Sequence, residues 1–186
     1  MDIIGILSIV VGIIIAITPF LWRRYFARPE LTIEIIKGGG ISSNVGVSSK
    51  NDTSKGYIDG NTALYVFKVN WEFKVIIRNN SETVAYYPKL TLDTTNPKFT
   101  KIEKLNELIP ISTKDTIELK AEYTKYEECQ GKDRSNVATF PEELKNMKIL
   151  LDYKNSSKIK SYTLYSHSDE VKNIFPFKRP KAFKQQ

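Results

Sequence analysis

An uncharged run of 20 residues, from Ile3 to Trp22, constrains this chain more than any other feature of its sequence. An α-helix rises about 1.5 Å per residue, so such a run would extend about 30 Å, the thickness of a bilayer's hydrocarbon core. The run is longer than the apolar core of a cleaved signal peptide, and no small-residue cleavage site follows it. The run therefore predicts an uncleaved transmembrane α-helix within residues 1–24.

The residues that flank this run predict its orientation. Three arginines lie just after it, whereas the short N-terminal side has no basic side chain. Basic residues favour the cytoplasmic side, and aromatic rings favour the membrane interface. The residues expected at the interface are Trp22, Arg23, Arg24, Tyr25 and Arg28. We therefore expect a single-pass protein of a bacterial inner membrane, with the lipid bilayer as one partner and the remaining domain in the cytoplasm. A single cysteine, which cannot form an internal disulfide, agrees with this compartment.

Small residues recur every four positions within the run, at Ser8, Gly12 and Ala16. Small side chains at this spacing allow two membrane helices to approach closely. The spacing predicts a homo-oligomer that forms through this helix face, although small residues are also common in short apolar helices.

The remainder of the chain predicts one β-rich domain. Apolar and polar residues alternate in several segments, and this period of two is typical of half-buried strands. Turn-forming sequences rich in Asn and Ser separate these segments. The segments are Leu31–Ile35, Trp71–Ile77, Val84–Leu92, Ile117–Tyr123, Ile149–Tyr153 and Tyr162–Tyr165. We expect an all-β fold, an antiparallel β-sandwich, over residues 31–167, joined to the helix by a short link at residues 25–30.

Two segments resemble strands of bacterial immunoglobulin-like and CARDB-like domains. The first is Trp71 to Tyr87, which looks like the B–C hairpin of such domains, and the second is Ile149 to Ser166, which looks like their F and G strands. The resemblance implies an immunoglobulin-like antiparallel β-sandwich of about seven strands, preceded by one transmembrane α-helix. It also implies a binding role without catalytic residues.

A search of the sequence for chemical groups finds no catalytic, metal-binding or cofactor-binding site. Acidic residues flank Cys129, and neighbouring negative charges raise the pKa of a thiol. The single histidine, His167, has no compact serine and acid arrangement beside it. Gly38-Gly39-Gly40 lacks the Lys and Ser/Thr of a phosphate-binding loop and predicts a turn between the first two strands. The polar loop at residues 51–61 lacks the carboxylate spacing of an EF-hand.

Residues 168–186 combine basic, aromatic and proline residues and predict a tail. The basic residues of this segment are Lys172, Lys178, Arg179, Lys181 and Lys184. Such a segment could lie on an anionic membrane, bind an acidic partner, pack on the domain or remain in solvent. The other lysines are scattered, so we do not expect nucleic acid as a partner, although the net charge is +7.

These observations favour a non-enzymatic, membrane-anchored module that binds an unknown protein or small molecule and needs no cofactor. One alternative is a membrane-perturbing effector, similar to those of anti-phage operons, whose β-rich domain senses a signal and whose helices oligomerise. A further alternative is an envelope or adhesion module with its domain outside the cell.

Overall fold

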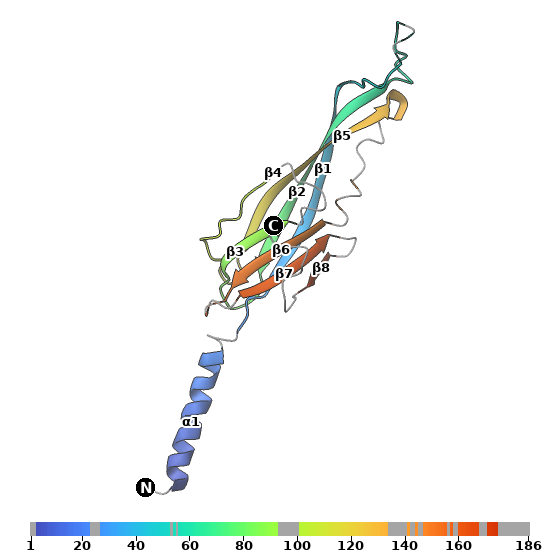
Figure 1. Ribbon diagram of the computed structural model, residues 1–186. Coiled ribbons are helices and arrows are strands. Elements are labelled where there is room, and N and C mark those ends of the chain that lie inside the picture. Colours follow the sequence, from blue (N-terminus) through green and yellow to red (C-terminus); the bar gives the residue numbers. More distant parts are fainter. Residues whose placement is uncertain are drawn as a thin grey trace.

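The computed structural model describes residues 3–22, 27–52, 54, 56–92, 101–133, 141, 144, 147–155, 157, 160–167 and 171–174. One helix, α1 (Ile3–Leu21), precedes eight strands. The strands are β1 (Leu31–Val47), β2 (Leu64–Asn79), β3 (Tyr86–Leu92), β4 (Lys101–Ile102), β5 (Thr116–Gln130), β6 (Met147–Lys154), β7 (Lys160–His167) and β8 (Val171–Ile174). Figure 1 shows α1 extending away from one end of an elongated β-domain.

The strands form two four-stranded antiparallel sheets, in the orders β1-β2-β5-β4 and β3-β6-β7-β8. The two sheets share one hydrophobic core, because alternate residues of β1, β2 and β5 meet those of β6. Leu31, Ile33, Val75, Ile149 and Leu151 are all fully buried in it. The expectation of a β-rich domain is confirmed, and the expected β6–β7 hairpin forms with continuous pairing from Met147↔His167 to Lys154↔Lys160.

The expected fold class, an immunoglobulin-like sandwich of about seven strands behind one transmembrane α-helix, is wrong. The described residues of the domain form eight strands in two sheets, and none of the described helices combines the length and apolar character needed to cross a membrane. The uncharged run misled the prediction because it indicates composition and does not show where a helix ends. The α-helix ends at Leu21 and contains Pro19, whereas the uncharged run continues to Trp22.

Three further expectations differ from the structure. The segment after the turn at Asn79 does not pair with β2, because β3 belongs to the other sheet. Strand β8 pairs with β7 inside the segment expected to be a tail, so Val171–Ile174 belongs to the domain. The glycine run does not form the turn between the first two strands; it lies within β1.

The glycine run is a β-bulge. Pairing between β1 and β2 shifts once between Lys37 and Gly40 and a second time between Asn44 and Gly46. At Gly38 a Cβ atom would lie 2.2 Å from the backbone oxygen of Glu72, and at Gly40 it would lie 2.6 Å from the Trp71 ring. A side chain at Gly38 would collide with the backbone of β2, and one at Gly40 could be accommodated only if the Trp71 ring moved.

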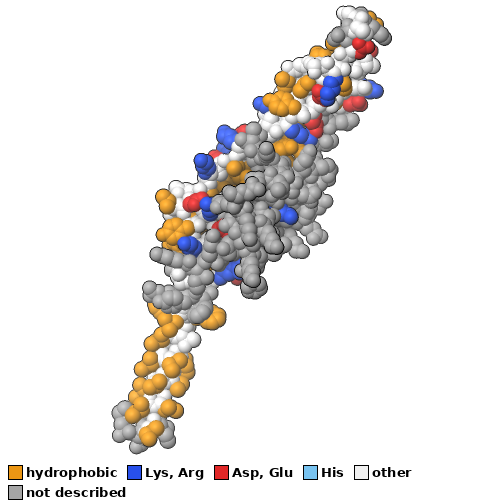
Figure 2. Space-filling view, viewed as in Figure 1, with side chains coloured by type: hydrophobic (Ala, Val, Ile, Leu, Met, Phe, Trp, Pro, Cys, Tyr) orange, Lys and Arg blue, Asp and Glu red, His pale blue; other side chains and the backbone are white. Residues whose placement is uncertain are grey.

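Three strands of the first sheet continue beyond the second sheet. Figure 1 shows β1, β2 and β5 extending past the ends of β6, β7 and β8, away from α1. We call this extension the distal ribbon; it consists of residues 40–47 of β1, 64–70 of β2 and 124–130 of β5. We call the rest of the domain, where the two sheets pack around the shared core, the proximal half. Figure 2 shows hydrophobic side chains along α1 at one end of the molecule and mixed side chains on the ribbon at the other.

Candidate functional site at the distal tip

The connection between β1 and β2, residues 48–63, forms the distal tip, at the end of the ribbon that lies farthest from α1 (Figure 1). The tip is rich in Asn, Asp, Ser and Gly, which favour turns because their side chains bond to nearby backbone or because they tolerate positive φ. Gly56 adopts a φ of 72°, in the left-handed region that glycine enters without strain.

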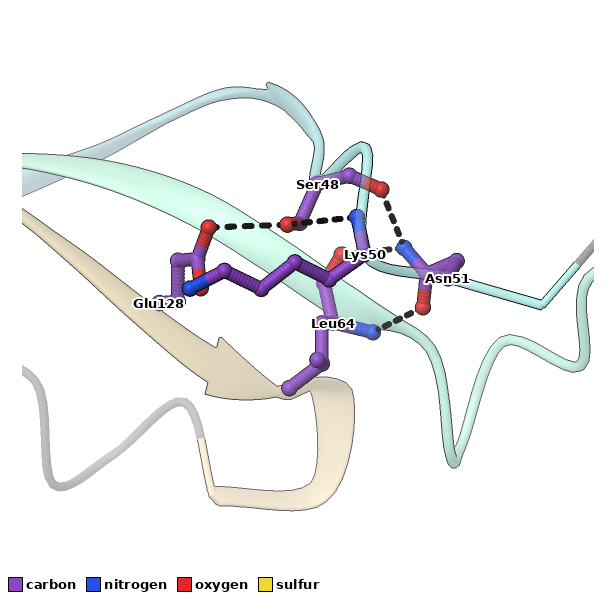
Figure 3. Close-up of polar contacts among 5 residues, drawn as sticks. All are labelled: Ser48, Lys50, Asn51, Leu64 and Glu128. Carbon is purple, nitrogen blue, oxygen red and sulfur yellow. Dashed lines mark hydrogen bonds and ion pairs between the residues drawn. The ribbon is translucent and has the colours of Figure 1, made fainter.

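Asn51 closes the base of this loop (Figure 3). Its side-chain amide donates hydrogen bonds to the carbonyl oxygens of Ser48 and Leu64, each at 2.8 Å. Its side-chain oxygen accepts a bond of 2.7 Å from the Leu64 N–H. The Asn51 side chain therefore bonds to backbone groups just after β1 and at the start of β2. These bonds replace the backbone hydrogen bonds that a longer pair of strands would form there.

Glu128 ties the loop to β5 (Figure 3). One carboxylate oxygen accepts a bond of 2.8 Å from the Ser48 hydroxyl, and the other lies 2.6 Å from the Lys50 amine. These bonds, led by the one from Lys50, hold the pKa of Glu128 below its ordinary value. The Lys50 side chain is 70% exposed, so the pair positions the loop more than it stabilises the fold.

Two aspartates of the tip bind their own loop. Asp52 accepts a bond from the Ser54 N–H at 2.8 Å, and Asp59 accepts one from the Asn61 N–H at 3.0 Å. Hydrogen bonds from Ser54 lower the pKa of Asp52. The described residues contain no group of three or more side chains that could hold a metal ion. The tip is therefore organised by its own polar contacts.

An open hollow of about 430 Å³ lies between the loop and the end of β5. It is lined mostly by polar groups, among them Lys50, Asp59 and Gln130. Beside it, Tyr57 is 69% exposed and Ile58 is 42% exposed. Binding sites for small molecules are usually concave and apolar, whereas exposed aromatic residues surrounded by polar groups are typical of protein contacts.

Cys129 lies at the edge of this region but is not activated. Burial, followed by the negative charges of Asp133 and Glu127, raises the pKa of its thiol. A thiol with a raised pKa carries little thiolate and is a poor nucleophile. The expectation that neighbouring acids raise the pKa of this thiol is confirmed for Glu127. Burial, which the sequence did not indicate, raises the pKa more than either acid does.

The site residues predicted from the sequence do not gather at the tip. Ser8, Gly12 and Ala16 lie on α1, where a Cβ atom added to Gly12 would meet nothing within 4 Å. Trp22 and Arg28 are exposed near the helix end. Lys172 lies in β8, and His167 ends β7. Seven of the predicted residues lie outside the described part of the chain: Arg23, Arg24, Tyr25, Lys178, Arg179, Lys181 and Lys184.

Sequence reasoning treated residues 51–61 as a polar loop and missed its organisation. The sequence shows that Asn, Asp, Ser and Gly are frequent in this loop, but it does not show the hydrogen-bond partners of Asn51 and Ser48. Leu64 and Glu128 are 13 and 80 residues away from them. The pairing of β1 with β2 brings Asn51 to Leu64, and the further pairing of β2 with β5 brings Ser48 to Glu128.

Comparison with known proteins adds no relative from which to transfer a function. No protein-family model matches the chain, and searches of curated proteins and of solved structures give no significant match. The resemblance to immunoglobulin-like and CARDB-like domains is not tested by these comparisons and stays a prediction.

Proposed function

We propose that this protein is a non-enzymatic interaction module that α1 attaches to a lipid membrane and whose distal tip binds a protein partner. The observation that carries the proposal is the separation of two unlike surfaces at opposite ends of one elongated domain (Figures 1 and 2). An apolar helix lies at one end and an ordered polar loop with an exposed tyrosine at the other.

The exposed side chains of α1 support the attachment to lipid. Large apolar side chains are exposed along its length, including Ile3, Leu7, Ile13 and Phe20. The Thr18 hydroxyl donates to the carbonyl oxygen of Ile14 at 2.6 Å, so it needs no water. A helix that exposes this much apolar surface is stabilised by an apolar environment.

The basic residues after α1 support a cytoplasmic location. The sequence places Arg23, Arg24 and Arg28 directly after the helix. The cytoplasmic leaflet carries anionic lipids, and each basic residue close to it contributes about 1 kcal/mol of attraction. The β-domain would then be held near this leaflet, with its tip directed towards partners in the cytoplasm.

Vesicle flotation tests the attachment. The full chain is expected to float with phosphatidylglycerol-containing vesicles, and the double variant Ile9→Asp/Ile13→Asp is expected to remain in the dense fraction. The variant Ile9→Leu/Ile13→Leu is the matched control, and circular dichroism verifies the β-domain in each. Equal flotation of all three proteins would contradict attachment through α1.

Site-specific crosslinking in cells tests the tip. A photoreactive benzoylphenylalanine at Tyr57 is expected to give a discrete adduct, whereas the same group at Glu118, which is exposed on the outer face of β5, is not. Tip-dependent binding requires that the adduct at Tyr57 disappears when Asn51→Ala loosens the loop. Adducts of equal yield at both positions would contradict a tip-specific partner.

A further inference from the structure

The unprotected edge of β1 suggests how a partner is held. We propose that residues 40–44 of β1 bind an extended segment of a partner protein, which adds to the sheet as a further strand. This inference rests on the proposed function and names the binding mode. Among the described residues, only β2 pairs with β1, which is therefore an edge strand.

The proximal part of the same edge is already occupied by an amide. The side-chain oxygen of Asn173 in β8 accepts a bond of 3.0 Å from the Ile33 N–H. Its side-chain nitrogen donates to the Ile33 carbonyl at 3.4 Å. Asn173 thus bonds to both backbone groups of Ile33, as a residue of an added strand would.

These bonds identify which backbone groups of β1 face outwards. In an antiparallel pair, every second residue directs its N–H and C=O away from its neighbour. Ile33 does so, and it lies opposite Ile77 of β2. Every second residue of β2, counted back from Ile77, belongs to the same set, which includes Trp71, Val69 and Phe67. After the first bulge, the β1 residues opposite these three are Gly40, Ser42 and Asn44. Three successive rungs of the ribbon edge therefore face outwards.

The two edges of the distal ribbon differ in charge. The β1 edge, residues 38–47, contains no charged residue, and its Ile41, Val45 and Val47 are at least half exposed. The β5 edge contains Lys125, which forms an ion pair with Glu127. Charged side chains protect an edge strand from pairing, and their absence leaves it open to an added strand.

The occupant in this proposal is an extended segment of another protein. The C-terminal segment contains Pro176 and Pro180, which cannot donate to a strand ladder. Two copies that paired antiparallel across a two-fold axis would direct their α1 helices in opposite directions, away from a shared membrane. The chain carries a net charge of +7, so an uncharged or acidic extended segment is the complementary partner.

Selection of displayed random peptides against the full chain in lipid nanodiscs tests the inference. Enriched peptides are expected to alternate apolar residues and to lack basic ones. Ser42→Pro, which removes one outward N–H, and Ile41→Lys are each expected to weaken the best synthetic peptide about tenfold or more. Tyr126→Lys, which adds the same charge on β5, is the matched control and is expected to bind normally.

Backbone hydrogen exchange gives a readout that side-chain effects would not reproduce. The Ser42 and Asn44 amides are expected to exchange more slowly when the peptide is bound. A peptide that binds equally to all variants and leaves these amides unchanged would overturn strand addition. Failure to enrich any peptide would also overturn it. Neither result would affect flotation or the Tyr57 adduct, which test the proposed function separately.

Discussion

The same three strands behave differently in the proximal half and in the distal ribbon. Near α1, strand β1 packs its alternate side chains into the core that both sheets share, and Asn173 covers its edge. Beyond the bulge, Phe67 and Val69 of β2 remain buried, but β1 exposes Ile41, Val45 and Val47. The contrast indicates that β1 packs into the core in the proximal half and presents a surface in the ribbon, where Phe67 and Val69 of β2 still belong to the core and the end is held by polar contacts.

The largest expected effect comes from two isoleucines of one strand. Ile33 is 0% exposed and Ile41 is 69% exposed. Ile33→Ala is expected to lower the free energy of unfolding by about 2–5 kcal/mol because it leaves a cavity. Ile41→Ala is expected to change it by less than about 0.5 kcal/mol. Urea unfolding followed by tryptophan fluorescence measures both, and similar losses would show that the two halves are equally important for stability.

Two neighbouring glycines, Gly38 and Gly39, test how rigid β1 is at the boundary between the two halves. A Cβ atom at Gly38 would collide with the Glu72 backbone, whereas one at Gly39 would meet nothing within 4 Å. Gly38→Ala is therefore expected to cost about 1–3 kcal/mol, because the backbone of two strands must shift. Gly39→Ala serves as the control and is expected to be close to neutral in the same unfolding measurement. A neutral Gly38→Ala would mean that the bulge adapts freely.

Two asparagines compare polar contacts in the two halves. Asn79 is 1% exposed, and its amide donates to the carbonyl oxygens of Thr83 and Ile111. Asn79→Ala is expected to cost about 1–3 kcal/mol of global stability, because it leaves buried carbonyl groups without these donors. Asn51→Ala is expected to leave the unfolding midpoint almost unchanged and to accelerate amide exchange at Leu64. Global destabilisation of equal size by both variants would contradict the division.

The smallest effect is a pH dependence at the tip. The pKa of Glu128 is lowered in the folded state by Lys50 and Ser48, so its contribution is fully present above the unfolded value of about 4.3. This contribution is lost as the pH falls through the lower folded value. The protection of the Lys50 amide, whose N–H donates to Ser48, is therefore expected to fall at acidic pH when its exchange rate is compared with the intrinsic rate at each pH. Glu128→Gln should remove this pH dependence, and Lys50→Met should move it to higher pH.

Alternation in the sequence was enough to predict the strands that face a core. The half-buried pattern of β2 and β5 and the β6–β7 hairpin follow from side chains that are local in sequence. The assignment of β3 to the second sheet does not, because it depends on which distant strand offers a better core contact. The contacts of the tip could not be predicted for the same reason, since Ser48 and Glu128 meet only because β1 pairs with β2 and β2 pairs with β5.

The two bulges in β1 have a consequence for insertions and deletions in this strand. Side chains alternate between the two faces of a sheet, so one extra residue exchanges the faces of everything that follows. The first bulge makes this exchange, and the second reverses it before the strand ends at Val47. Loss of Gly39 would remove the first bulge and leave Ile41 opposite Asn70 and Ser42 opposite Val69, on their present faces. Loss of Ser43, between the bulges, would instead move Asn44 from its place opposite Phe67 to the place opposite Lys68, on the other face. The two bulges are therefore the places at which β1 tolerates a change in length.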